Sequence, residues 1–191
     1  RITIDLDPTD DPTHGQQELT FFNGHYDTWC YLPLVATLTF NAEPTQYLVA
    51  AVLRPGNSPA KRGALGLLTR LRQRLRAAFP GVILRVRLDG GFASPEVLDF
   101  LEGEAVEYVV AMASNARLVK RVRRLMGRAR MRSKASGETA ALFGETRYAA
   151  RKWRRKRRIV MKAEVVRHPG RDPKNNPRFV ITNLTDVPEA V

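Results

Sequence analysis

Two aspartates that lie far apart in the sequence each close a predicted strand. Asp7 ends the alternating run Ile-Thr-Ile-Asp-Leu-Asp at residues 2–7, and Asp89 follows the strand-like run Val-Ile-Leu-Arg-Val-Arg-Leu at residues 82–88. If these strands are parallel neighbours in one sheet, both carboxylates stand at the same sheet edge, close enough to share a cation. Mg²⁺ or Mn²⁺ suits such a pair, because Mg²⁺ needs few protein carboxylates and keeps positions for water and phosphate. Divalent ions held in this way can promote an in-line displacement at phosphorus.

The other acids near the N-terminus are weaker candidates. Asp5 shares a strand face with Asp7, and we expect it to support the site or stay exposed rather than bind metal. Asp10 and Asp11 lie in a proline-rich turn and are expected to be solvated. Asp7 and Asp89 are each ordinary turn residues when considered alone, so the metal site depends on their joint placement.

The period of apolar residues predicts the elements that position these aspartates. Leu68, Leu71 and Leu75 follow helical spacing before Pro80-Gly81, whereas residues 2–7 alternate as a half-buried strand does. The first three strands are joined by short connections and are expected to form an antiparallel meander. The sequence predicts strands at 2–7, 31–40, 47–53, 82–88 and 106–112, and helices at 61–79 and 94–103. The fold class is therefore α/β, in the order β-β-β-α-β-α-β with sheet order 3-2-1-4-5, which is the ribonuclease-H-like architecture.

The composition changes after Ser114. We expect a short basic helix around 118–125, a mobile Gly-, Arg- and Ser-rich segment at 127–144, and strands at 146–153, 157–166 and 178–184. These elements make a basic β-rich insertion after the fifth strand. The predicted domains are a partial catalytic core at 1–114, a basic insertion at 115–185, and the start of a C-terminal catalytic helix at 186–191.

Positive charge is concentrated in the same region. Residues 115–158 contain 17 Lys or Arg and two acids, a net charge of +15, which exceeds the +13 of the whole 191-residue chain. Such a concentration predicts a polyanionic partner, most commonly a nucleic-acid backbone. Trp153 could stack on an exposed base, but packing inside the insertion is the favoured role. The predicted DNA-binding residues are Lys120, Arg121, Arg124, Arg151, Lys152, Trp153, Arg154, Arg155, Lys156, Arg157 and Arg158.

The rest of the composition bears on the core, the disulfides and the cellular location of the protein. The hydrophobic content of 43% supports a packed core, and the single cysteine, Cys30, excludes a disulfide within the chain. No apolar run approaches the roughly 20 residues of a membrane span, so no membrane partner is expected. We expect a cytoplasmic protein.

Two blocks of sequence resemble the bacterial insertion-sequence DDE transposases. Residues 5–17 resemble the first-aspartate block, with Asp7-Pro8-Thr9 at the family's Asp-x-Thr, and residues 86–93 resemble the second block, in which Phe92 follows Asp89. The resemblance implies metal-dependent cleavage and strand transfer at transposon ends, with Asp7 and Asp89 as two of three metal ligands. It also implies double-stranded DNA as the partner, at transposon ends and target, and a homodimer on that DNA, associated with the bacterial nucleoid.

The pattern that contains the family's third acid is not found in this sequence. That acid is a Glu within Tyr-x-x-Arg-x-x-x-Glu, and Glu189 lacks the preceding Tyr and Arg. We expect the third acid beyond Val191 and an inactive fragment in its absence.

Two alternatives remain open. Asp5-Leu6-Asp7-Pro8-Thr9 also fits haloacid-dehalogenase-type phosphatases, with Asp5 as nucleophile and Asp7 as general acid, but that fold needs a helical crossover after the first strand. The other alternative is a non-catalytic nucleic-acid-binding module in which the acids are turn residues.

Overall fold

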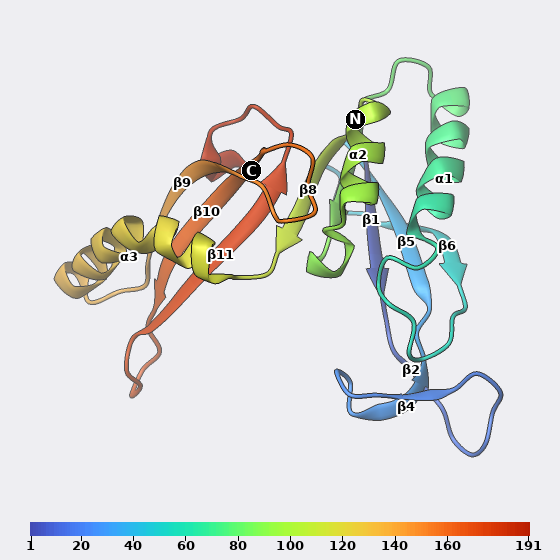
Figure 1. Cartoon of the computed structure of the whole chain (residues 1–191), viewed down its shortest axis with the longest axis horizontal. Coiled ribbons are helices and arrows are strands. Elements are labelled where there is room, and N and C mark those ends of the chain that lie inside the picture. The colour runs from blue at the N-terminus through green and yellow to red at the C-terminus, as the bar shows by residue number, and fades with distance from the viewer. The chain divides into compact units, whose positions relative to one another are not determined.

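The computed structural model describes residues 1–191 and divides into two compact units, 1–108 and 109–191. Both units combine helices with strands, so the chain is mixed α/β (Figure 1). The boundary falls within strand β8 (Glu107–Met112).

The sheet of the first unit has β1 (Ile2–Pro8) at its centre. β5 (Leu34–Phe40) pairs with β1 antiparallel, and β7 (Leu84–Leu88) pairs with its other edge in parallel. β6 (Tyr47–Val52) pairs antiparallel with β5, which gives the order β6-β5-β1-β7. The prediction that the strands before Asp7 and Asp89 are parallel neighbours is therefore confirmed.

Two helices cover one face of this sheet. α1 (Ala64–Ala78) and α2 (Pro95–Gly103) bury Leu68 and Leu101 against strand residues such as Ile4 and Val86. The alternation of β1 and β7 sends these apolar residues to the helix side. The polar residues between them, including both aspartates, therefore occupy the opposite face.

A small second sheet in this unit was not predicted. β2 (Asp11–Pro12), β4 (Thr28–Tyr31) and β3 (Phe21–Asn23) pair antiparallel in the order β2-β4-β3, near the end of β1 where Asp7 stands (Figure 1). The predicted strand at 31–40 is wrong at its start, because the chain leaves β4 at Tyr31 and enters β5 only at Leu34. Pro33 has no N–H to continue a ladder, which explains the break.

The second unit is an antiparallel sheet covered by one helix. β9 (Ala140–Tyr148), β10 (Arg157–Val166) and β11 (Lys174–Thr182) form successive antiparallel pairs, and β11 pairs with β8. The helix α3 (Ala116–Ser136) packs against β9, β10 and β11. A 3₁₀ turn at Pro188–Ala190 follows.

The predicted mobile segment at 127–144 is wrong. α3 starts at the cap Asn115, whose side chain accepts a hydrogen bond from Leu118 N, and continues to Gly137 at φ 73°. Gly127 and the serines suggested a loop, but Ala129 and Ser133 continue the helical spacing and are buried. Small residues therefore let the helix lie close to the sheet.

The strand bounds also shift in this unit. β9 lies at 140–148 rather than 146–153, and β11 begins at Lys174 rather than 178. Pro177 lies inside β11, paired with Ala163 of β10, but it precedes the residues Phe179–Thr182 that pair with β8. The β8-side edge of β11 is therefore unpaired at this proline, as on an edge strand. No helix in the structure is both long enough and apolar enough to cross a membrane.

Candidate functional site

The strand register brings Asp7 and Asp89 together. Leu6 is paired with Leu88 across the parallel strands, so the residues that follow them emerge side by side from the same sheet edge. Both carboxylates line one open cleft of about 600 Å³ in the first unit, together with Thr9, Gln46 and Thr37. The sequence had placed these two aspartates at strand ends, and the structure brings them to one cleft.

The electrostatics of the cleft are repulsive for a second negative charge. Partial burial raises the pKa of Asp7, and the charges of Asp89 and then Asp5 raise it further. The raised pKa means that the fold disfavours the ionised form of the Asp7 carboxyl. A cation between the two carboxylates would offset their repulsion and favour the ionised form of Asp7.

The turn after β7 holds Asp89 in place. Its Oδ1 accepts a hydrogen bond of 2.8 Å from Gly91 N and so caps the 3₁₀ turn Gly90–Phe92, while Phe92 is fully buried below. A Cβ on Gly91 would lie 2.6 Å from the Cβ of Ala60 and 3.1 Å from Asp89 Oδ1. Glycine is therefore required where the backbone approaches the carboxylate.

Asp5 is occupied by an ion pair rather than free to bind metal. Arg87 Nε and a terminal guanidinium nitrogen each lie 2.6 Å from one Asp5 oxygen, in a bidentate pair across β1 and β7. The expectation that Asp5 lies beside the site without serving as a ligand agrees with this contact. The register that pairs Asp5 with Arg87 could have been inferred once β1 and β7 were aligned.

Tyr26 is a site residue that the sequence did not indicate. Burial raises the pKa of its phenol, and the charges of Asp10, Asp7 and Asp89 raise it further, so the hydroxyl lies within their field. Its Oη donates a long hydrogen bond of 3.4 Å to Pro8 O. Only the small sheet returns this residue to the end of β1, and that sheet has no clear sequence pattern.

The donor set is limited to two close carboxylates. No group of three or more His, Cys, Asp or Glu side chains that could hold a metal ion occurs in residues 1–191. Asp7 and Asp89 nevertheless fit Mg²⁺, which is commonly held by one or two carboxylates plus water and phosphate oxygens.

The basic run at 151–158 divides into buried and exposed residues. Trp153 is only 9% exposed and packs edge-on against Tyr148, with ring centroids 5.9 Å apart. The buried guanidinium of Arg157 lies 5.2 Å from the centroid of the Trp153 ring. This packing is the role favoured for Trp153 over stacking on a base. Arg157 is likewise enclosed and not available to a phosphate.

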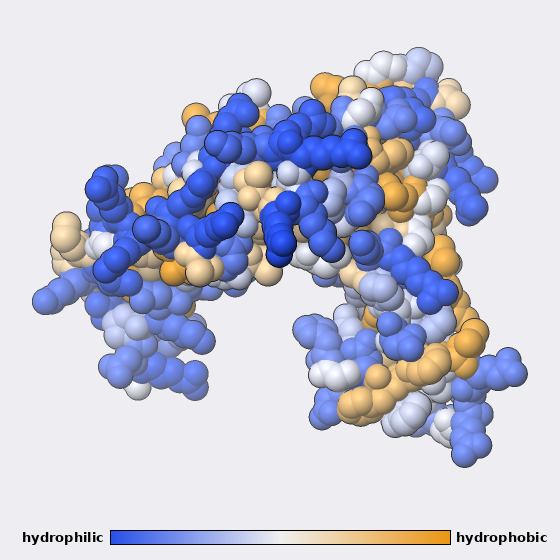
Figure 2. Space-filling view, viewed as in Figure 1, coloured by the Kyte–Doolittle hydropathy of each residue, from blue (hydrophilic) through white to orange (hydrophobic).

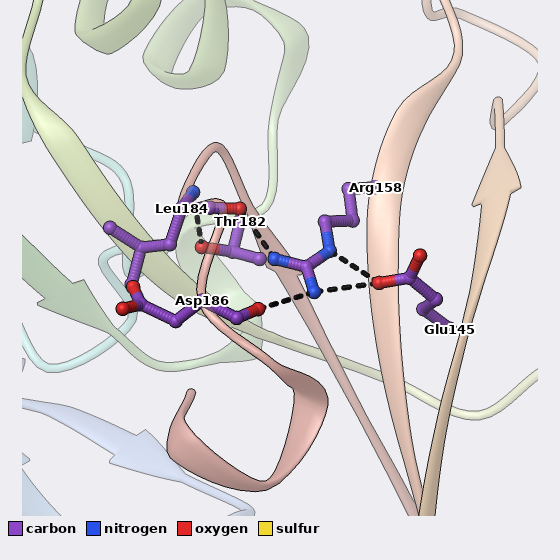
Figure 3. Close-up of polar contacts among 5 residues, drawn as sticks. All are labelled: Glu145, Arg158, Thr182, Leu184 and Asp186. Atoms are coloured by element: carbon purple, nitrogen blue, oxygen red, sulfur yellow. Dashed lines mark hydrogen bonds and ion pairs between the residues drawn. The ribbon is translucent and has the colours of Figure 1, made fainter.

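Arg158 connects three segments of the second unit (Figure 3). Its guanidinium forms an ion pair with Glu145 at 2.6 Å and donates hydrogen bonds to Leu184 O and Asp186 O. These contacts tie β10 to β9 and to the segment that follows β11. The guanidinium of Arg158 is thus engaged inside the fold, which argues against the expected contact with DNA.

The other predicted DNA-binding residues remain at the surface. Arg121 donates to Thr146 Oγ1 at 2.8 Å and to Arg147 O, so part of its guanidinium is engaged with β9. Exposed side chains are presented by Lys120, Arg124, Arg151, Lys152, Arg154, Arg155 and Lys156. The surface of α3 and the turn before β10 thus carry the accessible charge.

The chain is similar to known proteins in both its fold and its sequence family. No curated protein sequence matches the chain. The chain is similar to piggyBac transposase in the cryo-EM structure of its synaptic complex with hairpin DNA, with a TM-score of 0.52 and 12% sequence identity. That match covers 97% of this chain and 34% of the other, so the chain spans about a third of its length. The family model of the transposase DDE domain, group 1, matches residues 1–191, and the chain belongs to that family.

Proposed function

We propose that the chain is the catalytic domain of a DNA transposase that cuts and joins DNA strands at transposon ends. The observation that carries this proposal is the placement of Asp7 and Asp89 at adjacent ends of parallel strands, on one cleft. The order β6-β5-β1-β7 supports a ribonuclease-H-like core. In this proposal the core takes residues 1–114 and the insertion residues 115–185. A third acid beyond Val191, a homodimer on DNA and a location at the bacterial nucleoid belong to the same proposal.

The two aspartates would hold Mg²⁺ or Mn²⁺ through their carboxylate oxygens. Divalent ions bound there supply activation of the attacking oxygen and stabilisation of the leaving oxygen. Gly91 N fixes Asp89 by its hydrogen bond, and Arg87 binds both oxygens of the neighbouring Asp5. The chain's own role is thus to orient two ligands and limit negative charge around them.

The reaction would proceed in two displacements at phosphorus. Water attacks a phosphodiester at the transposon end, breaks one P–O bond and leaves a 3′-hydroxyl. That hydroxyl then attacks a target phosphodiester, forming a new P–O bond as the target strand breaks. The exposed cations of the second unit would hold the DNA during both displacements.

The alternatives have less support. A phosphatase nucleophile at Asp5 is disfavoured because both oxygens of that carboxylate are held by Arg87 and strands, not a helix, follow β1. A non-catalytic module would give no reason for two carboxylates to line one cleft, where the charge of Asp89 raises the pKa of Asp7.

The metal site predicts an unusual stability pattern. In EDTA at pH 7, Asp7→Asn should raise Tm, because the folded-state pKa of Asp7 is raised and ionisation therefore lowers the free energy of unfolding as pH increases through that pKa. Adding 10 mM Mg²⁺ should stabilise the wild type by about 1.4 kcal/mol if the Kd is on the order of 1 mM. Differential scanning fluorimetry measures both effects.

Asp11→Asn is the matched control, because Asp11 is an exposed aspartate outside the cleft. It should retain the Mg²⁺-dependent increase in Tm, whereas Asp7→Asn and Asp89→Asn should abolish it. An undiminished Mg²⁺ effect in both cleft variants would disprove the metal site.

A further inference from the structure

The helix α3 carries charge without any compensation of its own. Its 21 residues, Ala116–Ser136, include nine Lys or Arg and no acid. Helices usually place acids three or four residues from such cations, and their absence leaves the cations mutually repulsive. We propose, building on the proposed function, that the outer face of α3 is the main phosphate-binding track for duplex DNA, with Gly127 at the point of closest approach.

The buried side of α3 defines which residues face outward. Leu118, Val122, Met126, Ala129 and Ser133 are buried, and the helix packs on β9, β10 and β11. With 100° between successive residues, the opposite side carries the outer-face cations. These are Arg117, Lys120, Arg123, Arg124, Arg128 and Lys134. Figure 2 shows mainly hydrophilic side chains over the region of α3.

The outer-face cations have no partner within the chain. Each is exposed, and none forms an intramolecular hydrogen bond or ion pair. Arg121 and Arg130 of the same helix differ, because Arg121 donates to β9 and Arg130 Nε donates to Asn175 Oδ1 at 3.1 Å. The helix therefore separates arginines that fasten it to the sheet from cations that remain available to phosphates.

Gly127 lies on this outer face, between Arg124 and Arg128. Glycine is a poor helix former, and a Cβ here would meet no atom within 4 Å, so packing inside the chain does not require it. A glycine commonly marks a place where a ligand comes close to the backbone. Its position among the outer-face cations points to a phosphodiester strand passing over the helix.

The partner that fits is a long regular polyanion. α3 is about 30 Å long, at roughly 1.5 Å per residue, and its cations extend from the first turn to the last. A duplex presents phosphates along such a length, and Arg binds them through paired N–H groups. Such a track would bind DNA independently of its base sequence, because phosphate contacts carry no sequence information directly.

The track is tested by two double variants of equal charge. Arg124→Gln with Arg128→Gln removes two outer-face cations, and Arg70→Gln with Arg74→Gln removes two exposed cations at the same spacing on α1. Binding of a 30-base-pair duplex of arbitrary sequence to the 191-residue chain is measured between about 50 and 200 mM salt. The slope of log affinity against log salt should be about 1.8 smaller in magnitude for the α3 variant than for the wild type. Over the same increase in salt, the DNA affinity of the variant should therefore fall about 12-fold less than that of the wild type. The α1 variant should match the wild type.

A glycine pair separates binding from folding. Gly127→Ala and Gly66→Ala both add a methyl group to a helix at a position with no atom within 4 Å, so both should raise Tm. Only Gly127→Ala should weaken duplex binding, by about 10-fold. A more stable protein with weaker DNA binding is not expected from a purely structural role.

The outcomes distinguish this inference from the proposed function. If the wild-type chain binds duplex and the α3 variants keep its affinity and salt slope, the α3 track is wrong while the DNA-binding function stands. If the wild-type chain shows no salt-dependent duplex binding, the DNA contact in the proposed function fails together with the track.

Discussion

Replacing either cleft aspartate in the full-length protein is expected to abolish strand cleavage. Asp7→Asn and Asp89→Asn each keep the side-chain shape but remove a negative charge from the pair that lines the cleft. Loss of one metal ligand should reduce the cleavage rate by about 10³-fold or more, since electrostatic stabilisation of the displaced oxygens would be lost. Cleavage of a labelled transposon-end duplex in Mg²⁺ measures the effect.

DNA binding provides the internal check on these variants. The predicted phosphate contacts lie on the second unit, so the Kd for transposon-end DNA should stay within about twofold of the wild type. Asp11→Asn should cleave normally. Cleavage at the wild-type rate by either cleft variant would rule out the assigned ligands.

Arg158→Gln is expected to give the largest loss of stability among the basic residues. The substitution removes the ion pair with Glu145 and two charge-assisted hydrogen bonds to Leu184 O and Asp186 O (Figure 3). Hydrogen bonds to charged groups contribute roughly 1.5–3 kcal/mol each, and partial exposure of Asp186 limits the total to about 3 kcal/mol. Urea unfolding followed by circular dichroism measures the change.

Arg154→Gln is the matched control for this substitution. Arg154 belongs to the same basic run but is exposed, so its loss should change the free energy of unfolding by no more than about 0.5 kcal/mol. DNA affinity should follow the reverse order, with a clear loss for Arg154→Gln and little change for Arg158→Gln. Equal stability of the two variants would contradict the structural role of Arg158.

The core of the site could be predicted because its determinants are local. Alternation along residues 2–7 and the strand-like run before Asp89 indicate two strands, each with an aspartate at its end. The crossover through a helix then makes the strands parallel, and β1 and β7 are indeed neighbours. The α1 and α2 helices were also predicted, since leucine spacing and the Ser94-Pro95 start are local features.

The second unit could not be predicted as well, because its packing depends on residues without a strong local preference. Ala129 and Ser133 were interpreted as part of a loop, yet they are buried where α3 approaches the sheet. Gly127 weakened the helical pattern further. The full length of α3 becomes evident only when the sheet that covers its inner side is known.

Side-chain partners were the least predictable part of the sites. The basic run at 151–158 appears uniform in sequence, but the fold encloses Trp153 and Arg157 and commits Arg158 to backbone carbonyls. Tyr26 is brought to the end of β1, where it bonds to Pro8 O, only by the small sheet. These distinctions arise from contacts between segments distant in sequence, which composition and periodicity do not encode.

The most direct test of the metal site is a crystal structure of the chain grown with Mn²⁺, with anomalous diffraction recorded to locate the ion. The two-aspartate site predicts a peak bound jointly by carboxylate oxygens of Asp7 and Asp89. Mn²⁺ bound elsewhere with none at this pair, or the two side chains directed away from each other, would contradict the account.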